Sequence, residues 1–321
     1  MESVRQILSY NIPDAYEGRA EGTTVSLSLK AWTAPYPQIL GQNNLTVHPP
    51  TNAGLLAMFG VEDDLDQLRL STYAYPLNSY VDVLSTEGDS VASFHRQITT
   101  AVRLAFTNYP FIIERSESGP PGHAPFAETV DHYFSFTHVN RECLLAAGEL
   151  KNRGIIRRAR WYGVQAAAGT EARLGKELRG YATKYRTPQM YCYDGSNLLI
   201  VQFRAQTEAD IQDEACPIDC MVIPRSSEVD DHCSMRMALY RLVSQGIRRC
   251  LALYAPQLAI GACRREWEYF SGCPYWRSNV GRTADLVVGG VSYQREFDQQ
   301  NRAWKWTPNN GQVGQWDTYV L

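Results

Sequence analysis

The stretch Thr129-VDHYFSFTHVNRECLLAAGEL-Lys151 contains the two segments on which the fold depends. Val130, Tyr133 and Phe134 are β-favouring residues and predict a strand over 129–137. The apolar run 143–150 predicts a second, buried strand. The short polar segment between the two strands predicts an antiparallel hairpin.

Three charged side chains lie at the ends of these strands. Residues two apart on a strand point to the same face, so Glu149 and Lys151 project together and Leu150 points into the opposite layer. If the strands pair, Asp131 approaches the same face. Two carboxylates beside one ammonium group can hold a divalent cation such as Mg²⁺ and stabilise charge on a phosphoryl group.

The sequence before this stretch predicts a helix and a short strand. Val91, Phe94, Ile98 and Val102 recur at helical spacing after a capping Ser90, which predicts a helix over 89–107. A strand over 110–114 follows. The Ser/Gly/Pro segment 116–126 disfavours regular structure.

The sequence after Lys151 predicts a helix, a hairpin and a final long helix. The helix over 172–186 carries an apolar stripe at Leu174, Leu178, Tyr181 and Tyr185. Residues 189–204 predict two strands turned at an Asp-Gly pair, and the last helix covers 234–251. Leu286-Val287-Val288 and 303–307 favour a terminal hairpin or small sheet. These patterns divide the chain into an irregular N-terminal elaboration (1–88), a core (89–255) and an aromatic C-terminal extension packed on the core (256–321).

This order of elements resembles the αβββαβ core of the PD-(D/E)XK nuclease superfamily over about 115 residues. The resemblance implies an α/β fold with a mixed central sheet flanked by helices, plus N- and C-terminal elaborations. It implies catalytic roles for Asp131, Glu149 and Lys151, with Mg²⁺ or Mn²⁺ bound by Asp131 and Glu149. Val130 stands where the family name has proline. Glu177 is the candidate for the carboxylate or amide that many members carry on the following helix.

A basic segment follows the charged cluster, although the whole chain has a net charge of −3. Nine basic residues stand against two acidic ones between Lys151 and Lys184. Such local positive charge is typical of a surface that binds the phosphate backbone of DNA or RNA. The residues predicted to bind nucleic acid are Arg153, Arg157, Arg158, Arg160, Lys176 and Arg179.

A second resemblance leads to an alternative function. Stretches such as LRGYATKY (178–185) and MALYRLVSQGIRRC (237–250) look like uncharacterised filamentous-fungal proteins of the nuclease-like fold. They resemble, loosely, fungal tRNA-dependent synthases of arginine-containing cyclodipeptides in secondary metabolism. That function implies aminoacyl-tRNA as partner and no cofactor. The DDxxE motif associated with those synthases is not matched, because Asp230-Asp231 is followed by Ser234 in the last position.

Plainer interpretations of the same residues stay open. Glu149 and Lys151 are also typical of a surface ion pair. The arginines of the basic segment are also typical of a solvated loop. His95 is expected to be a packed histidine, and His132 to face away from Asp131. A third possible function is an inactive module that binds nucleic acid.

Composition bounds the class of protein. Hydrophobic residues make up 44% and charged residues 20%, which is the range of globular proteins. The sequence has no long apolar stretch for a membrane and no secretory leader pattern. Its eight cysteines are spread too widely for a small disulfide scaffold. We therefore expect an intracellular protein, cytoplasmic or nuclear, without a membrane partner.

Overall fold

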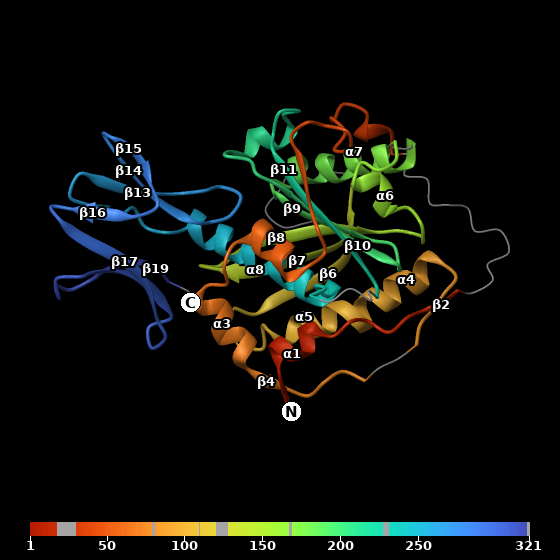
Figure 1. Ribbon diagram of the computed structural model, residues 1–321, viewed down its shortest axis with the longest axis horizontal. Coiled ribbons are helices and arrows are strands. Elements are labelled where there is room, and N and C mark those ends of the chain that lie inside the picture. The colour runs from red at the N-terminus through yellow and green to blue at the C-terminus, as the bar shows by residue number, and fades with distance from the viewer. Residues whose placement is uncertain are drawn as a thin grey trace.

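The computed structural model describes residues 1–17, 30–78, 81–108, 110–119, 128–166, 169–226 and 231–319, and its centre is a seven-stranded mixed sheet (Figure 1). The strands occur in the order β3 (Leu45–His48), β11 (Ile218–Pro224), β10 (Asn197–Phe203), β9 (Gln189–Tyr193), β8 (Arg141–Leu150), β7 (Val130–His138) and β6 (Ile112–Ser118). Neighbours run antiparallel except for β3 with β11 and β8 with β9. The predicted mixed α/β class is confirmed.

Strands β7 and β8 form the predicted antiparallel hairpin, paired from His132 with Gly148 to His138 with Arg141. Val139 and Asn140 form its turn with φ angles of 48° and 59°. Two residues in the left-handed region give the turn whose twist matches that of paired strands. The buried run that ends at Leu150 carries β8 through the centre of the molecule.

Helix α7 (Gly169–Lys184) connects the parallel strands β8 and β9 and covers one face of the sheet. Two parallel strands must be joined by a long crossover connection, because a tight turn can join only antiparallel strands. The apolar stripe of α7 joins one of the two large cores. The 3₁₀ turns η1 (Ala31–Thr33) and η3 (Glu208–Gln212) contribute to this side of the molecule. The predicted hairpin β9–β10 is also confirmed, with Gly195 at φ 84°.

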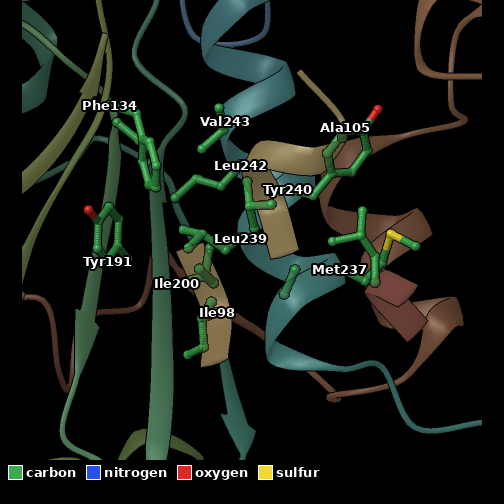
Figure 2. Packing of buried hydrophobic residues seen from close by; sticks show 14 of the residues in the cluster. Ile98, Ala105, Phe134, Tyr191, Ile200, Met237, Leu239, Tyr240, Leu242 and Val243 are labelled. Carbon is green, nitrogen blue, oxygen red and sulfur yellow. The ribbon is translucent and has the colours of Figure 1, made fainter. Parts of the chain in front are cut away.

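Helix α8 (Met235–Leu253) covers the opposite face of the sheet. Leu239, Leu242 and Val243 lie beside Phe134 and other buried residues of the sheet (Figure 2). A Cβ atom on Gly246 would lie 2.4 Å from the backbone oxygen of Leu145, so glycine permits this close approach of helix and strand. The approach places the second large core between α8 and the sheet.

The helix predicted over 89–107 forms, but it contains a π-helical segment. Helix α4 (Glu87–Ser93) continues into η2 (Phe94–Thr99) and then α5 (Thr100–Leu104). The backbone amide of Thr100 donates to the carbonyl of His95, five residues earlier, instead of four. This extra residue per turn changes the direction in which His95 projects.

The described residues of the N-terminal segment (1–88) form regular elements, although the sequence predicts an irregular elaboration there. They contain α1 (Val4–Ser9), α2 (Asn52–Phe59) and α3 (Asp64–Ser71), whose apolar residues join the core under α8. These helices are six to eight residues long, too short for a clear apolar periodicity. Strand β3 also belongs to this segment and extends the central sheet. Two small pairs complete it, β1 (Glu2–Ser3) with β4 (Tyr73–Ala74) and β2 (Tyr16–Glu17) with β5 (Val83–Leu84).

The C-terminal segment forms two four-stranded sheets beside the central fold (Figure 1). The first contains β12 (Ala259–Ile260), β13 (Cys263–Trp267), β14 (Pro274–Ser278) and β15 (Gly281–Thr283). The second contains β16 (Leu286–Val288), β17 (Val291–Asp298), β18 (Ala303–Pro308) and β19 (Gln315–Tyr319). Trp276 and Trp306 are buried in a third core here. The Gln189 side chain donates to the Phe270 carbonyl at 2.6 Å and so links this segment to the central sheet.

Candidate active site

Strands β7 and β8 bring Asp131 and Glu149 together at the open end of the hairpin, opposite its turn. The backbone amide of Leu150 donates to the Asp131 carboxylate at 2.9 Å, which holds this side chain across the two strands. The Lys151 amide then donates to the Tyr193 carbonyl at 2.9 Å, so the chain remains extended beyond β8. Glu149 and Lys151 therefore project from the same side, as the strand alternation predicts.

The charged groups of these residues meet over the sheet. The Lys151 ammonium contacts the Glu149 carboxylate and lies 3.9 Å from that of Asp131. Helix α7 adds Glu177, whose carboxylate is 3.5 Å from the same ammonium. We call Asp131, Glu149, Lys151 and Glu177 the carboxylate cluster. Its members come from two strands and the helix that crosses over them.

Lys30, just before η1, closes the carboxylate cluster from outside. Its ammonium lies 2.6 Å from the Glu177 carboxylate and 3.5 Å from that of Glu149. It also donates to the Tyr181 hydroxyl at 2.6 Å, and that hydroxyl donates to the Thr129 carbonyl at 2.9 Å. An ammonium group therefore occupies the space between the two buried glutamates.

Among the described residues, three carboxyl groups of this region face two ammonium groups, those of Lys30 and Lys151. Burial raises the pKa of Glu149 well above its ordinary value, and the charge of Glu177 raises it further. Burial opposes the charge of Lys151, but Glu149 and Glu177 outweigh this effect and raise its pKa. Lys151 therefore stays protonated, and the carboxyl group of Glu149 favours its neutral form unless another cation binds beside it.

The carboxylates of this cluster offer the oxygen atoms that a hard divalent cation prefers. Asp131 keeps 31% of its side chain exposed, whereas Glu149 and Glu177 are fully buried. Within the described ranges, the three carboxylates do not bring all their ligand atoms within 4.8 Å of one another. Mg²⁺ is commonly held by one or two carboxylates with water in its other positions. Asp131 and Glu149 are the residues that would hold it.

The basic segment after Lys151 lies partly on the surface. Arg153, Arg157 and Arg158 are exposed, on the loop after β8 and at the start of the short helix α6 (Arg158–Trp161). The Arg153 side chain donates to the Ser196 hydroxyl at 2.6 Å. Arg158 stands 5.9 Å from the ring centre of Tyr162. These arginines follow the carboxylate cluster directly in the chain.

Two of the residues predicted to contact nucleic acid are less exposed, and their guanidinium groups bind other parts of the protein. Arg160 donates to both carboxylate oxygens of the buried Glu171 at 2.7 Å. Arg179 is completely buried, and its guanidinium donates to Gln42 at 3.0 Å and to the Asp213 carbonyl at 2.5 Å. The prediction that Arg179 contacts nucleic acid at the surface is therefore wrong, because its side chain turns into the interior beside η3. Lys176 remains partly exposed on α7.

Other residues noted in the sequence lie away from the carboxylate cluster. His132 faces the opposite side of β7, as predicted, and approaches His95 there. Asp230 lies outside the described residues, and Asp231 accepts a hydrogen bond from Asn52 at 2.8 Å. Sequence reasoning missed Lys30, because no local pattern connects it with a strand more than a hundred residues later. It also missed Glu114, which lies beside the two histidines.

No known protein family, curated protein or solved structure matches this chain. Across the described residues, no helix combines the length and apolar character that crossing a bilayer requires.

Proposed function

We propose that the chain is a nucleic-acid-acting enzyme that hydrolyses phosphodiester bonds with a divalent metal ion. The observation that supports this most is the meeting of Asp131, Glu149 and Lys151 at the ends of paired strands, with Glu177 from the crossover helix. The order α5, β6, β7, β8, α7 and β9 is the one that a resemblance to the αβββαβ core of the PD-(D/E)XK superfamily implies, and it supports the proposal.

Each residue of the carboxylate cluster has a distinct task in this reaction. Asp131 and Glu149 would hold Mg²⁺ or Mn²⁺, which would supply positive charge at the phosphate and lower the pKa of the attacking water. Lys151 remains protonated and donates a hydrogen bond to a developing phosphoryl oxygen. Glu177 holds the Lys151 ammonium from the side of α7 and so fixes its direction.

The substrate is held by its phosphate backbone. Arg153, Arg157 and Arg158 are the exposed cations that follow the carboxylate cluster. Guanidinium groups form bidentate hydrogen bonds with phosphate, and they do so without reading base sequence. We therefore propose DNA or RNA as the substrate class and a salt-dependent affinity.

The test is a cleavage assay of the full chain with labelled single- and double-stranded DNA and RNA, with Mg²⁺ or Mn²⁺ added after treatment with a chelator. Asp131→Asn and Glu149→Gln keep the shape of each side chain and remove its charge. We expect both to lower cleavage by roughly 100-fold or more, since losing one group that stabilises the transition state has an effect of this order.

The matched control is Glu142→Gln, at the far end of β8, where the carboxylate accepts from Ser135 at 2.6 Å. It should cleave at the rate of the unmodified protein. A protein that is folded but inert towards DNA and RNA with both metals would overturn the proposal. Inert protein that still binds nucleic acid would identify the third function, an inactive binding module.

A second candidate is tRNA-dependent synthesis of an arginine-containing cyclodipeptide. The contact of the Lys30 ammonium with Glu149, Glu177 and Tyr181 supports it, because the same carboxylates can pair with an arginine guanidinium of a substrate. This function needs no metal. Mass spectrometry of extracts from an expressing host separates the two candidates, since a new Arg-Xaa diketopiperazine cannot arise from a nuclease.

A further inference from the structure

The opposite face of β7 carries a second group of polar side chains in an otherwise apolar layer. His132 follows Asp131 in the chain and is completely buried on this face. Its Nε2 atom lies 2.9 Å from the carboxylate of Glu114 on the neighbouring strand β6. Phe94, Phe134 and Tyr191 surround the ring. A buried imidazole in such a setting is held in one orientation.

The π-helical segment η2 delivers a second imidazole to the same carboxylate. The Nδ1 atom of His95 lies 2.7 Å from the Glu114 Oε1 atom that also faces His132. His95, Glu114 and His132 can each offer one ligand atom, and these atoms lie within 4.8 Å of one another. In the described parts of the chain, no other group of three or more His, Cys, Asp or Glu residues meets this limit. We call these three residues the histidine cluster.

The Tyr191 hydroxyl supplies the outer partner that metal-bound histidines have in proteins. It contacts the Nδ1 atom of His132, the nitrogen on the far side of the ring from Glu114. When Nδ1 carries the proton and donates to this hydroxyl, the lone pair of Nε2 faces Glu114 and can bind an ion in place of the hydrogen bond to that carboxylate. Tyr191 is itself completely buried on β9, so its position is fixed by packing.

One side of the histidine cluster is open to solvent. A pocket of about 490 Å³ is lined by His95 and Glu114 together with Ser116, Thr99 and the arginines Arg96 and Arg103. His95 keeps 34% of its side chain exposed, whereas His132 closes the inner side. Three protein ligands with an open fourth position are the arrangement of catalytic zinc sites, while structural sites are closed by four.

We propose that His95, Glu114 and His132 bind a divalent transition-metal ion of the zinc type, with one coordination position open to this pocket. Two imidazoles and one carboxylate prefer Zn²⁺ or a similar ion over Mg²⁺, which favours oxygen ligands. The site is separate from the carboxylate cluster, because adjacent residues of β7 point to opposite faces of the sheet.

The test is calorimetric titration of the chelator-treated full chain with Zn²⁺, repeated with Co²⁺, whose visible spectrum reports its coordination. We expect one tight Zn²⁺ site in the unmodified protein. His95→Gln is the first variant, because His95 is on the surface side and its loss leaves the core intact. Glu114→Gln is the second. Both should abolish the tight binding and the spectrum of bound Co²⁺.

Tyr191→Phe tests the outer partner without removing a ligand. It should weaken Zn²⁺ binding by roughly 10- to 100-fold, the range for losing such a partner. A merely structural Tyr191 would change stability and leave the Zn²⁺ affinity unchanged.

Two controls fix the location of the ion. His48→Gln removes a histidine that contacts Asp219 at 3.0 Å, away from the histidine cluster, and should bind Zn²⁺ normally. Asp131→Asn should also keep Zn²⁺ binding, since the carboxylate cluster lies on the other face. Absence of a tight Zn²⁺ site in the unmodified protein, or tight binding that persists in both His95→Gln and Glu114→Gln, would overturn the proposal.

Discussion

The two faces of β7 differ in how they treat buried charge. On the α7 face, the three carboxylates of Asp131, Glu149 and Glu177 exceed the nearby ammonium groups, and the pKa of Glu149 is raised. On the opposite face, the carboxylate of Glu114 accepts hydrogen bonds from two imidazoles, and its pKa is lowered. Adjacent residues of one strand thus belong to environments with opposite preferences.

This difference has a chemical meaning. The carboxylate cluster offers oxygen atoms and surplus negative charge, which suit a hard cation with bound water. The histidine cluster offers nitrogen atoms and one oxygen, which suit a softer ion. A single strand can contribute to both clusters, because adjacent side chains point to opposite faces.

The largest effect is expected when the carboxylate cluster loses its buried cation. Lys151→Met leaves Asp131, Glu149 and Glu177 without their shared ammonium group, and breaking a buried ion pair in this way costs about 3–5 kcal/mol of the free energy of unfolding. Urea denaturation at about pH 8 measures it. Lys176→Met, on the partly exposed side of α7, is the control and should change stability by less than about 0.5 kcal/mol. An equal loss of free energy of unfolding in Lys151→Met and Lys176→Met would contradict the claim that the carboxylate cluster depends on its buried ammonium group.

A smaller effect is expected when the packing behind the histidine cluster is disturbed. A Cβ atom on Gly148 would lie 2.2 Å from the Tyr191 ring, so Gly148→Ala must displace that ring from His132. We expect a loss of about 1–3 kcal/mol in the free energy of unfolding, the usual cost of overpacking. Zn²⁺ affinity should fall as well. Gly88→Ala, where the nearest atom would be 3.6 Å away, is the control and should not lose stability by overpacking.

The sign of the charge imbalance can be tested directly. The pKa of Glu149 is higher in the folded protein than in the unfolded chain, so its contribution to stability is present below the ordinary carboxyl pKa and lost as pH rises. Glu149→Gln should therefore stabilise the metal-free protein at about pH 8. The gain should vanish in acid. Thermal denaturation in chelator across this range measures it, and destabilisation at high pH would mean that the ion pairs of Glu149 outweigh the surplus charge.

The smallest effect on stability is expected at the surface arginines. Arg157→Gln and Arg158→Gln should each leave the free energy of unfolding within about 0.5 kcal/mol. Each should also reduce the slope of log affinity for nucleic acid against log salt by about 1. Arg103→Gln is the control on the other face, where the side chain is 62% exposed. A change in the salt slope with Arg103→Gln instead would place the nucleic acid at the histidine cluster.

The central fold follows from local sequence patterns to a large extent. Alternation and apolar runs predict β7, β8, β9 and β10, and helical spacing predicts α7 and α8. Strand alternation also places Glu149 and Lys151 on one face. The short helices before residue 88 escape such reasoning, because two turns contain too few residues to define a face. Strand β3 escapes it too, since its pairing with β11 joins distant segments.

The rest of each cluster depends on tertiary contacts that no local pattern contains. Lys30 reaches Glu177 from a remote segment, and Glu114 reaches His132 from the next strand of the sheet. Arginine is usually found at the surface, yet hydrogen bonds to the Asp213 carbonyl and to Gln42 hold Arg179 inside. His95 is placed by the π-helical turn, which helical spacing alone does not reveal.

The π-helical turn of η2 has a consequence for the history of this chain. Such a turn arises when one residue is inserted into an α-helix, and removing one residue would restore α-helical winding. The residues before the deletion would then rotate by about 100° around the helix axis relative to those after it. His95 would leave Glu114, while Asp131, Glu149 and Lys151 would stay in place. Relatives that differ by one residue in this helix would therefore keep the carboxylate cluster and lack the histidine cluster, so evolution can add or remove the second without touching the first.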